Sequence, residues 1–188
     1  GQIESSYRDL YPRWGMTLDA NFRHTPFGGH SLGEIGSAEA YIYLPGFIRH
    51  HGFRLYTAYQ RKDPGEYRFA DLINYPRGYS DIYLDDAFSL SAGYKFPFWY
   101  PDLALGPVMY LKRLKASVFW DYASGEHRDS KNQLRQEEYQ SLGLDLTADM
   151  HVLRFLAPFD MGLRTIYLPE ESDFQFQFLF SMDVNSFY

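Results

Sequence analysis

Apolar and polar residues alternate along most of this chain, in segments separated by polar connections. Successive residues of a β-strand point to opposite faces, so this alternation predicts strands with one apolar and one polar face. In the clearest segment, Phe174, Phe176 and Phe178 alternate with Gln175 and Gln177. Eight segments of this kind occur, at residues 16–22, 38–44, 53–59, 88–96, 114–122, 142–148, 159–167 and 174–184.

The length of these segments and of their connections indicates a membrane protein. A tilted strand needs about 9 to 11 residues to cross a bilayer, whereas strands of soluble proteins usually have about 5 or 6. Long or charged connections at 25–37, 61–86 and 124–139 alternate with shorter ones at 45–51 and 151–158, although 98–112 and 168–173 do not fit. Long outer loops and short periplasmic turns are typical of bacterial barrels. The pattern predicts one all-β domain over residues 1–188, an antiparallel up-and-down transmembrane β-barrel with about eight strands here.

Composition agrees with this prediction and excludes several functions. The 17 Tyr and 16 Phe residues suit the aromatic girdles of a membrane barrel. There is no cysteine, which excludes disulfides and thiol chemistry, and the net charge of -6 argues against nucleic acid as a partner. The sequence contains no run of about 18 apolar residues, so it does not predict a membrane-spanning helix. Because the chain begins at Gly1 and not at Met, we expect a processed or trimmed product.

The sequence contains no recognisable catalytic or metal-binding motif. Its six histidines lack a metal spacing, and there is no nucleophile elbow or phosphate-binding glycine loop. The paired carboxylates Asp85 and Asp86 are interpreted as solvated loop charge, with a calcium ion as the alternative. We therefore predict a protein without catalytic activity, cofactor or metal, while an active site assembled from scattered loop residues stays open as an alternative.

Three short motifs follow one another along the chain: Pro76-Arg77-Gly78-Tyr79, then Phe119-Trp120-Asp121, and finally the aromatic strand that ends at Tyr188. Taken together and in this order, they resemble the surface-antigen family of outer-membrane assembly factors. The resemblance implies that the loop at 61–86 folds back into the barrel lumen with the Arg-Gly-aromatic motif at its tip. It also implies that Arg77 reaches the inner wall near Asp121, in a charge-assisted and bidentate contact.

The resemblance assigns a lumenal motif consisting of Arg77, Gly78, Tyr79, Phe119 and Asp121. The intervening strand departs from the family pattern, because Gly93 stands where related sequences often carry an acidic residue. We expect the network of polar contacts in the lumen to be reduced at this point.

The last strand resembles the C-terminal signal by which outer-membrane proteins are assembled. Its apolar positions, counted by twos, include Phe178, Phe180, Met182, Val184 and the terminal Tyr188. The resemblance implies that the barrel assembly machinery reads this strand, so that machinery is an expected partner together with outer-membrane lipid.

Barrels of this family have sixteen strands, so the chain resembles the C-terminal half of one. The implied location is the bacterial outer membrane, and the implied function is insertion, assembly or translocation of client polypeptides. One alternative is a passive pore or ligand-binding barrel whose lumenal charges are Asp19, Arg23, Lys115 and Arg164. Another is a soluble lipocalin-like module. The apolar face distinguishes them, because it points inward in a soluble barrel and outward in a membrane barrel.

Overall fold

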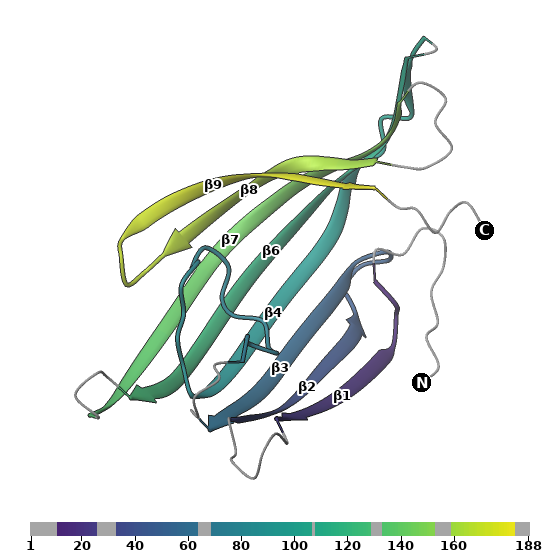
Figure 1. Cartoon of the computed structure of the whole chain (residues 1–188). Coiled ribbons are helices and arrows are strands. Elements are labelled where there is room, and N and C mark those ends of the chain that lie inside the picture. The colour runs from purple at the N-terminus through teal and green to yellow at the C-terminus, as the bar shows by residue number, and fades with distance from the viewer. Residues whose placement is uncertain are drawn as a thin grey trace.

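The strands of the described part of the chain form one antiparallel sheet (Figure 1). The computed structural model describes residues 11–25, 33–63, 69–106, 108–128, 133–152 and 159–182. The strands are β1 (Gly15–His24), β2 (Glu34–Pro45), β3 (Gly52–Asp63), β4 (Asp86–Trp99), β5 (Leu103–Leu105), β6 (Met109–Arg128), β7 (Leu134–Val152), β8 (Phe159–Leu168) and β9 (Asp173–Met182). Among these residues no helix is long and apolar enough to cross a membrane.

The topology is up-and-down, with strands in the order β1-β2-β3-β4-β6-β7-β8-β9 and the short β5 paired to β6. The predicted all-β, antiparallel up-and-down architecture is thereby confirmed. The sheet is open, because β1 and β9 lie at its two edges and are not paired with each other in the described part of the chain. Closure into a transmembrane barrel stays a prediction.

Each of the eight predicted segments corresponds to one long strand, but several predicted connections were wrong in extent, because the strands continue into them. The connection at 98–112 contains β5, where Leu103 pairs with Leu111. The connection at 124–139 is mostly paired, because β6 and β7 continue to the pair Arg128 and Leu134. Charged residues occupy both faces of these strand ends, so alternation of apolar residues could not reveal them.

The register places the apolar positions of all long strands in continuous rows on one face. One row runs across the sheet through Met16, Ile42, Leu55, Ala92, Trp120, Leu142, Tyr167 and Phe174. Much of this face is exposed, with Leu18 at 71% and Phe176 at 77%. We call it the apolar face.

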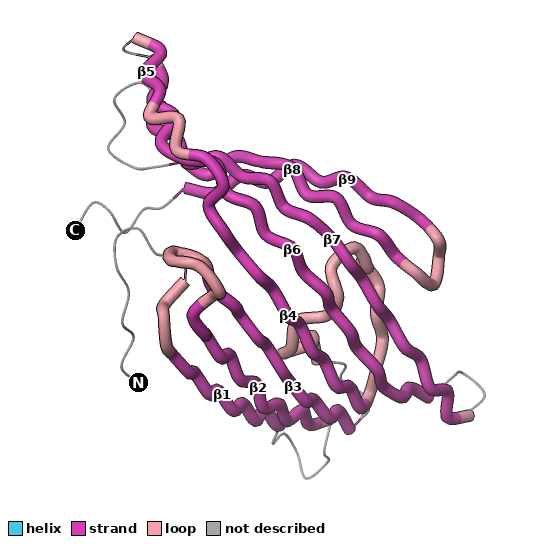
Figure 2. The backbone as a smooth tube through the Cα atoms, turned by 180° about the vertical axis from the view of Figure 1, so that it is seen from behind, coloured by secondary structure: helices cyan, strands magenta, loops and turns pink. Residues whose placement is uncertain are grey.

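The opposite face is polar and concave, and residues 69–85 lie across it (Figures 1 and 2). Arg54 of β3 and Arg164 of β8 line one small cavity on this face. On a flat sheet, four strand spacings of about 4.8 Å would separate them by about 19 Å. Their approach to the same cavity therefore requires strong curvature toward this side.

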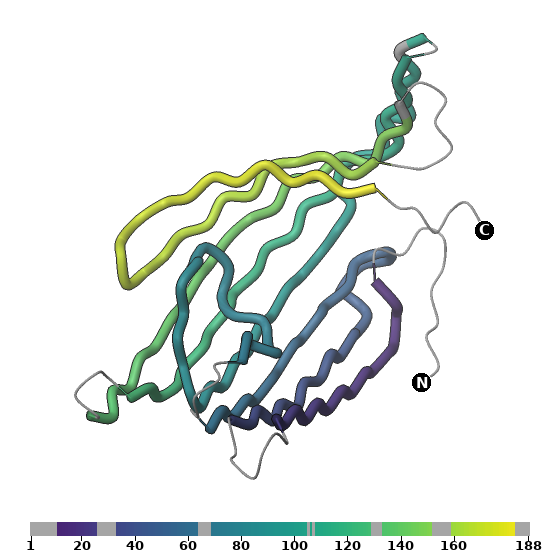
Figure 3. Tube along the Cα trace, viewed as in Figure 1, coloured from purple at the N-terminus to yellow at the C-terminus, as the bar shows by residue number. Residues whose placement is uncertain are grey.

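The buried core lies between the concave face and the segment 69–85, which leaves β3 and returns to β4 (Figure 3). Ile73, Ile82 and Leu84 of the segment pack with Tyr56 and Ala58 of β3. A second cluster holds Phe119, Ile166 and Leu168 against Tyr79. Within the predicted loop at 61–86, residues 69–85 are thus packed against the sheet, and residues 61–63 and 86 belong to β3 and β4.

Candidate functional site on the concave face

Arg77 and Asp121 form a bidentate ion pair on the concave face. Arg77 donates from Nε to Asp121 Oδ2 at 2.9 Å and from Nη2 to Oδ1 at 3.1 Å, and its backbone N–H donates to Oδ2 at 3.2 Å. Asp121 is buried, with 4% of its side chain exposed. The contact between Arg77 and Asp121, expected from the resemblance, is present.

Asp121 also accepts hydrogen bonds from the strands on both sides of β6. Ser91 of β4 donates to Oδ1 at 2.5 Å, and Ser141 of β7 donates to Oδ2 at 3.3 Å. Burial lowers the pKa of the Arg77 guanidinium, and the charge of Asp121 opposes this shift. Arginine stays protonated in proteins, so Arg77 keeps its charge, and both carboxylate oxygens of Asp121 have hydrogen-bond donors.

Phe119, two residues before Asp121 on the same face of β6, packs its ring against the guanidinium of Arg77. The Arg77 Cζ lies 3.6 Å from the centroid of the Phe119 ring, in cation–π geometry. The ring occupies the space over Gly143 of β7, where an added β-carbon would overlap its Cζ. The absence of a side chain at Gly143 therefore leaves the space that the Phe119 ring occupies.

Gly78 allows the tip of the segment to approach the sheet closely. Its φ of +98° is one that L side chains rarely adopt. A β-carbon at Gly78 would also lie 2.9 Å from Leu168 Cδ2 and 3.2 Å from Ile166 Cγ2. Both the backbone conformation and the close contact require glycine here.

Tyr79 fixes the far side of the segment to the turn between β8 and β9. Its hydroxyl lies 2.6 Å from Glu170 Oε2 and 3.0 Å from the Gln140 carbonyl oxygen. Desolvation, followed by the hydrogen bond with Glu170, raises the pKa of Tyr79. A hydroxyl has one proton, so the shorter contact to the carboxylate is the stronger hydrogen bond.

Further hydrogen bonds, which the alternation of residues did not predict, hold the first part of the segment. Gln60 donates to Asp71 Oδ1 at 2.7 Å and accepts from the Leu72 N–H at 2.6 Å. The Tyr56 hydroxyl accepts from the Asn74 N–H at 2.9 Å. Both side chains lie on the polar face of β3, and alternation carries no information about partners in a connection.

The four residues of the pore alternative fall into two groups. Arg164 donates to Asp145 at 2.7 and 2.9 Å, and Lys115 pairs with Asp160 at 2.7 Å. Asp19 and Arg23 lie on the exposed β1 strand, where Asp19 contacts Asn21. The structure thus joins two of the four to the ion pairs of the concave face.

The residues of the C-terminal signal are only partly described. Phe178, Phe180 and Met182 lie on the apolar face of β9, exposed by 63%, 59% and 41%. Val184 and Tyr188 lie outside the described residues.

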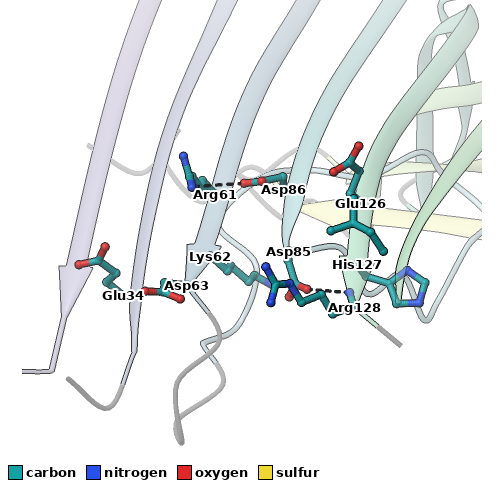
Figure 4. Close-up of a pocket in the computed structure, with 10 residues that line it drawn as sticks. Glu34, Arg61, Lys62, Asp63, Asp85, Asp86, Glu126, His127 and Arg128 are labelled. Carbon is teal, nitrogen blue, oxygen red and sulfur yellow. Dashed lines mark hydrogen bonds and ion pairs between the residues drawn. The ribbon is translucent and has the colours of Figure 1, made fainter. Parts of the chain in front are cut away.

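A larger cavity of about 490 Å³ lies at one end of the sheet and is lined by residues at the ends of β2, β3, β4, β6 and β7. Figure 4 shows its charged lining, in which Asp86 faces Arg61 at 3.7 Å and Asp85 accepts from the Arg128 N–H at 3.1 Å. No group of three or more potential metal ligands occurs among the described residues. Acidic and basic groups are mixed here, and Asp85 and Asp86 pair with protein groups.

Comparison with known proteins finds no matching family model, no matching curated protein and no matching solved structure.

Proposed function

We propose that this chain is part of an outer-membrane β-barrel of the surface-antigen type, which inserts or translocates polypeptides without catalysing a covalent step. The observation that carries the proposal is the ion pair between Arg77 and Asp121. It connects the segment 69–85 to the sheet at the two positions that the resemblance assigns. Breaking a buried pair of this kind costs about 3–5 kcal/mol, so the pair braces the segment strongly.

The two faces of the sheet support a membrane location. The apolar face is exposed, and the charged pairs lie on the concave face. A soluble barrel has the opposite arrangement, with its apolar side chains inside. Lipid is the solvent that suits the apolar face, since large exposed apolar patches are rare on soluble monomers.

The open edges of β1 and β9 support a role in a larger barrel. Unpaired N–H and C=O groups are costly in lipid, so both edges need a partner strand. Eight further strands would supply it in a barrel of sixteen. In such a barrel, weak pairing between the first and last strands would allow lateral opening. The segment 69–85, held by the pair Arg77 and Asp121, would stabilise the strands to which it is bound.

The proposal is tested by reconstituting the full chain into lipid vesicles and adding an unfolded outer-membrane β-barrel as client. Client folding is followed by its heat-dependent mobility in gel electrophoresis. We expect several-fold faster folding than in empty vesicles, and loss of this acceleration with Arg77→Ala. Arg61→Ala, which removes an arginine whose side chain is 75% exposed, serves as the matched control.

Three results would contradict the proposal. Client folding at the same rate with and without the chain would remove the assembly function, and steady ion conductance without any client effect would favour the passive pore. Recovery of the chain in the aqueous phase, without detergent or vesicles, would favour the soluble module.

A further inference from the structure

We infer that the concave face contains an anion-binding site around Gly93, which takes a small oxyanion such as phosphate or a carboxylate. A cavity of about 190 Å³ lies there, lined by side chains from β3, β4, β6, β7, β8 and the segment 69–85. A single water needs about 10–15 Å³ on this scale, so a small oxyanion fits with room for water. This inference does not depend on the proposed function.

The lining of this cavity has an excess of positive charge. Four cations line it, Arg54, Arg77, Lys95 and Arg164, against the single carboxylate of Asp145. Including Asp121, which holds Arg77 from the neighbouring side, the balance is four positive charges and two negative ones, a net of +2. Ser117, Thr147 and Tyr11 complete the lining with hydroxyl groups.

Two of the four cations form ion pairs with a carboxylate, and the other two have no carboxylate partner among the described residues. Arg77 is held by Asp121 and Arg164 by Asp145. Arg54 and Lys95 form no ion pair with any residue that the structure describes, and both lie near the ring of Tyr11, at 5.9 and 5.5 Å from its centroid. The Nε of Arg54 is buried and has no hydrogen-bond partner among the described residues.

A buried donor without a partner costs about 1–3 kcal/mol, and more when the group is charged. An oxyanion in the cavity would accept from Arg54 and Lys95 and remove this cost. Gly93 provides the space for it, since an added β-carbon would meet only Arg54 O and Val118 O, both at 3.9 Å. Gly93 pairs with Arg54 on one side and Phe119 on the other, so its face belongs to the cavity.

The first experiment titrates the full chain, folded in detergent micelles, with sodium phosphate at constant ionic strength in a calorimeter. Sodium acetate is the carboxylate probe in a parallel titration, and micelles containing phosphatidylglycerol distinguish a lipid phosphate from the free ion. We expect saturable binding with one ion per chain, weakened at least tenfold by Arg54→Gln or Lys95→Gln. Arg61 lines the separate cavity at the end of the sheet, so we expect Arg61→Gln to keep the wild-type affinity.

The second experiment keeps all four cations and introduces a side chain into the cavity at position 93. Gly93→Asp places a carboxylate beside Arg54 and Lys95, and Gly93→Asn is a neutral control of the same size. We expect Gly93→Asp to abolish phosphate binding and to raise the unfolding midpoint above that of Gly93→Asn. Absence of saturable binding to the wild-type chain overturns the inference. So does equal weakening by Arg61→Gln, or a Gly93→Asp chain no more stable than Gly93→Asn.

Discussion

The ring of Phe119 lies over Gly143 of the adjacent strand, in the space that a side chain of residue 143 would need. This pairing of an aromatic residue with a glycine across two strands positions the ring beneath Arg77. The position of Arg77 therefore depends also on Gly143, through the aromatic ring that lies between them.

Gly143→Ala should destabilise the fold, because its β-carbon would collide with the Phe119 ring and with the backbone of Thr165. Overpacking of this kind costs about 1–3 kcal/mol. The free energy of unfolding in urea, measured in vesicles, gives the value. Gly36→Ala on β2 is the matched control, since its nearest neighbour would be Phe22 Cδ2 at 3.7 Å. Equal stability of the two variants would contradict this account.

Removal of either partner of the brace should cost about 3–5 kcal/mol, and the double variant Arg77→Ala with Asp121→Ala should cost less than the sum. The coupling free energy from this double-mutant cycle is the measurement. Exchange of the two charges, Arg77→Asp with Asp121→Arg, should restore only part of the stability, because Ser91 and Ser141 also donate to Asp121. A coupling indistinguishable from zero would mean that the pair does not brace the segment.

Tyr79→Phe should weaken the attachment of the segment to the turn between β8 and β9 by about 1 kcal/mol. The variant loses the hydroxyl that contacts Glu170 at 2.6 Å, in a partly solvated position where screening limits the gain. Unfolding in urea measures the loss, and Glu170→Gln should produce a smaller one. Tyr59→Phe on the apolar face, where the residue is 50% exposed, should be neutral.

Leu144→Arg distinguishes lipid from water as the environment of the apolar face. Residue 144 is 37% exposed there, and arginine near the middle of a bilayer costs a membrane barrel about 2–4 kcal/mol. Gln136→Arg changes a residue on the same face of β7, near the N-terminal end of the strand, and should be tolerated. If both variants unfold at the same urea concentration in vesicles, this face does not contact lipid.

The positions and faces of the long strands were predictable from sequence, because alternation reports directly which residues share a side. It gives no register and no curvature, so the meeting of Arg54 with Arg164 over Gly93 could not be foreseen. The contact between Arg77 and Asp121 followed from the resemblance alone. The anchors at Gln60 and Asp71 were missed because hydrogen bonds to a connection leave no periodic signal. Closure of the sheet and the functional role of the motif residues stay predictions.

The segment 69–85 makes contacts that are remote in the chain: Arg77 binds a residue 44 positions later, and Tyr79 one 91 positions later. Contacts of such separation form slowly, because loop closure precedes any gain in energy. Docking of Tyr79 has to wait for the turn that holds Glu170, near the end of the chain. We therefore expect the contact between Tyr79 and Glu170 to form only once the turn between β8 and β9 is in place, whereas the pairing of Arg77 with Asp121 of β6 does not require that turn.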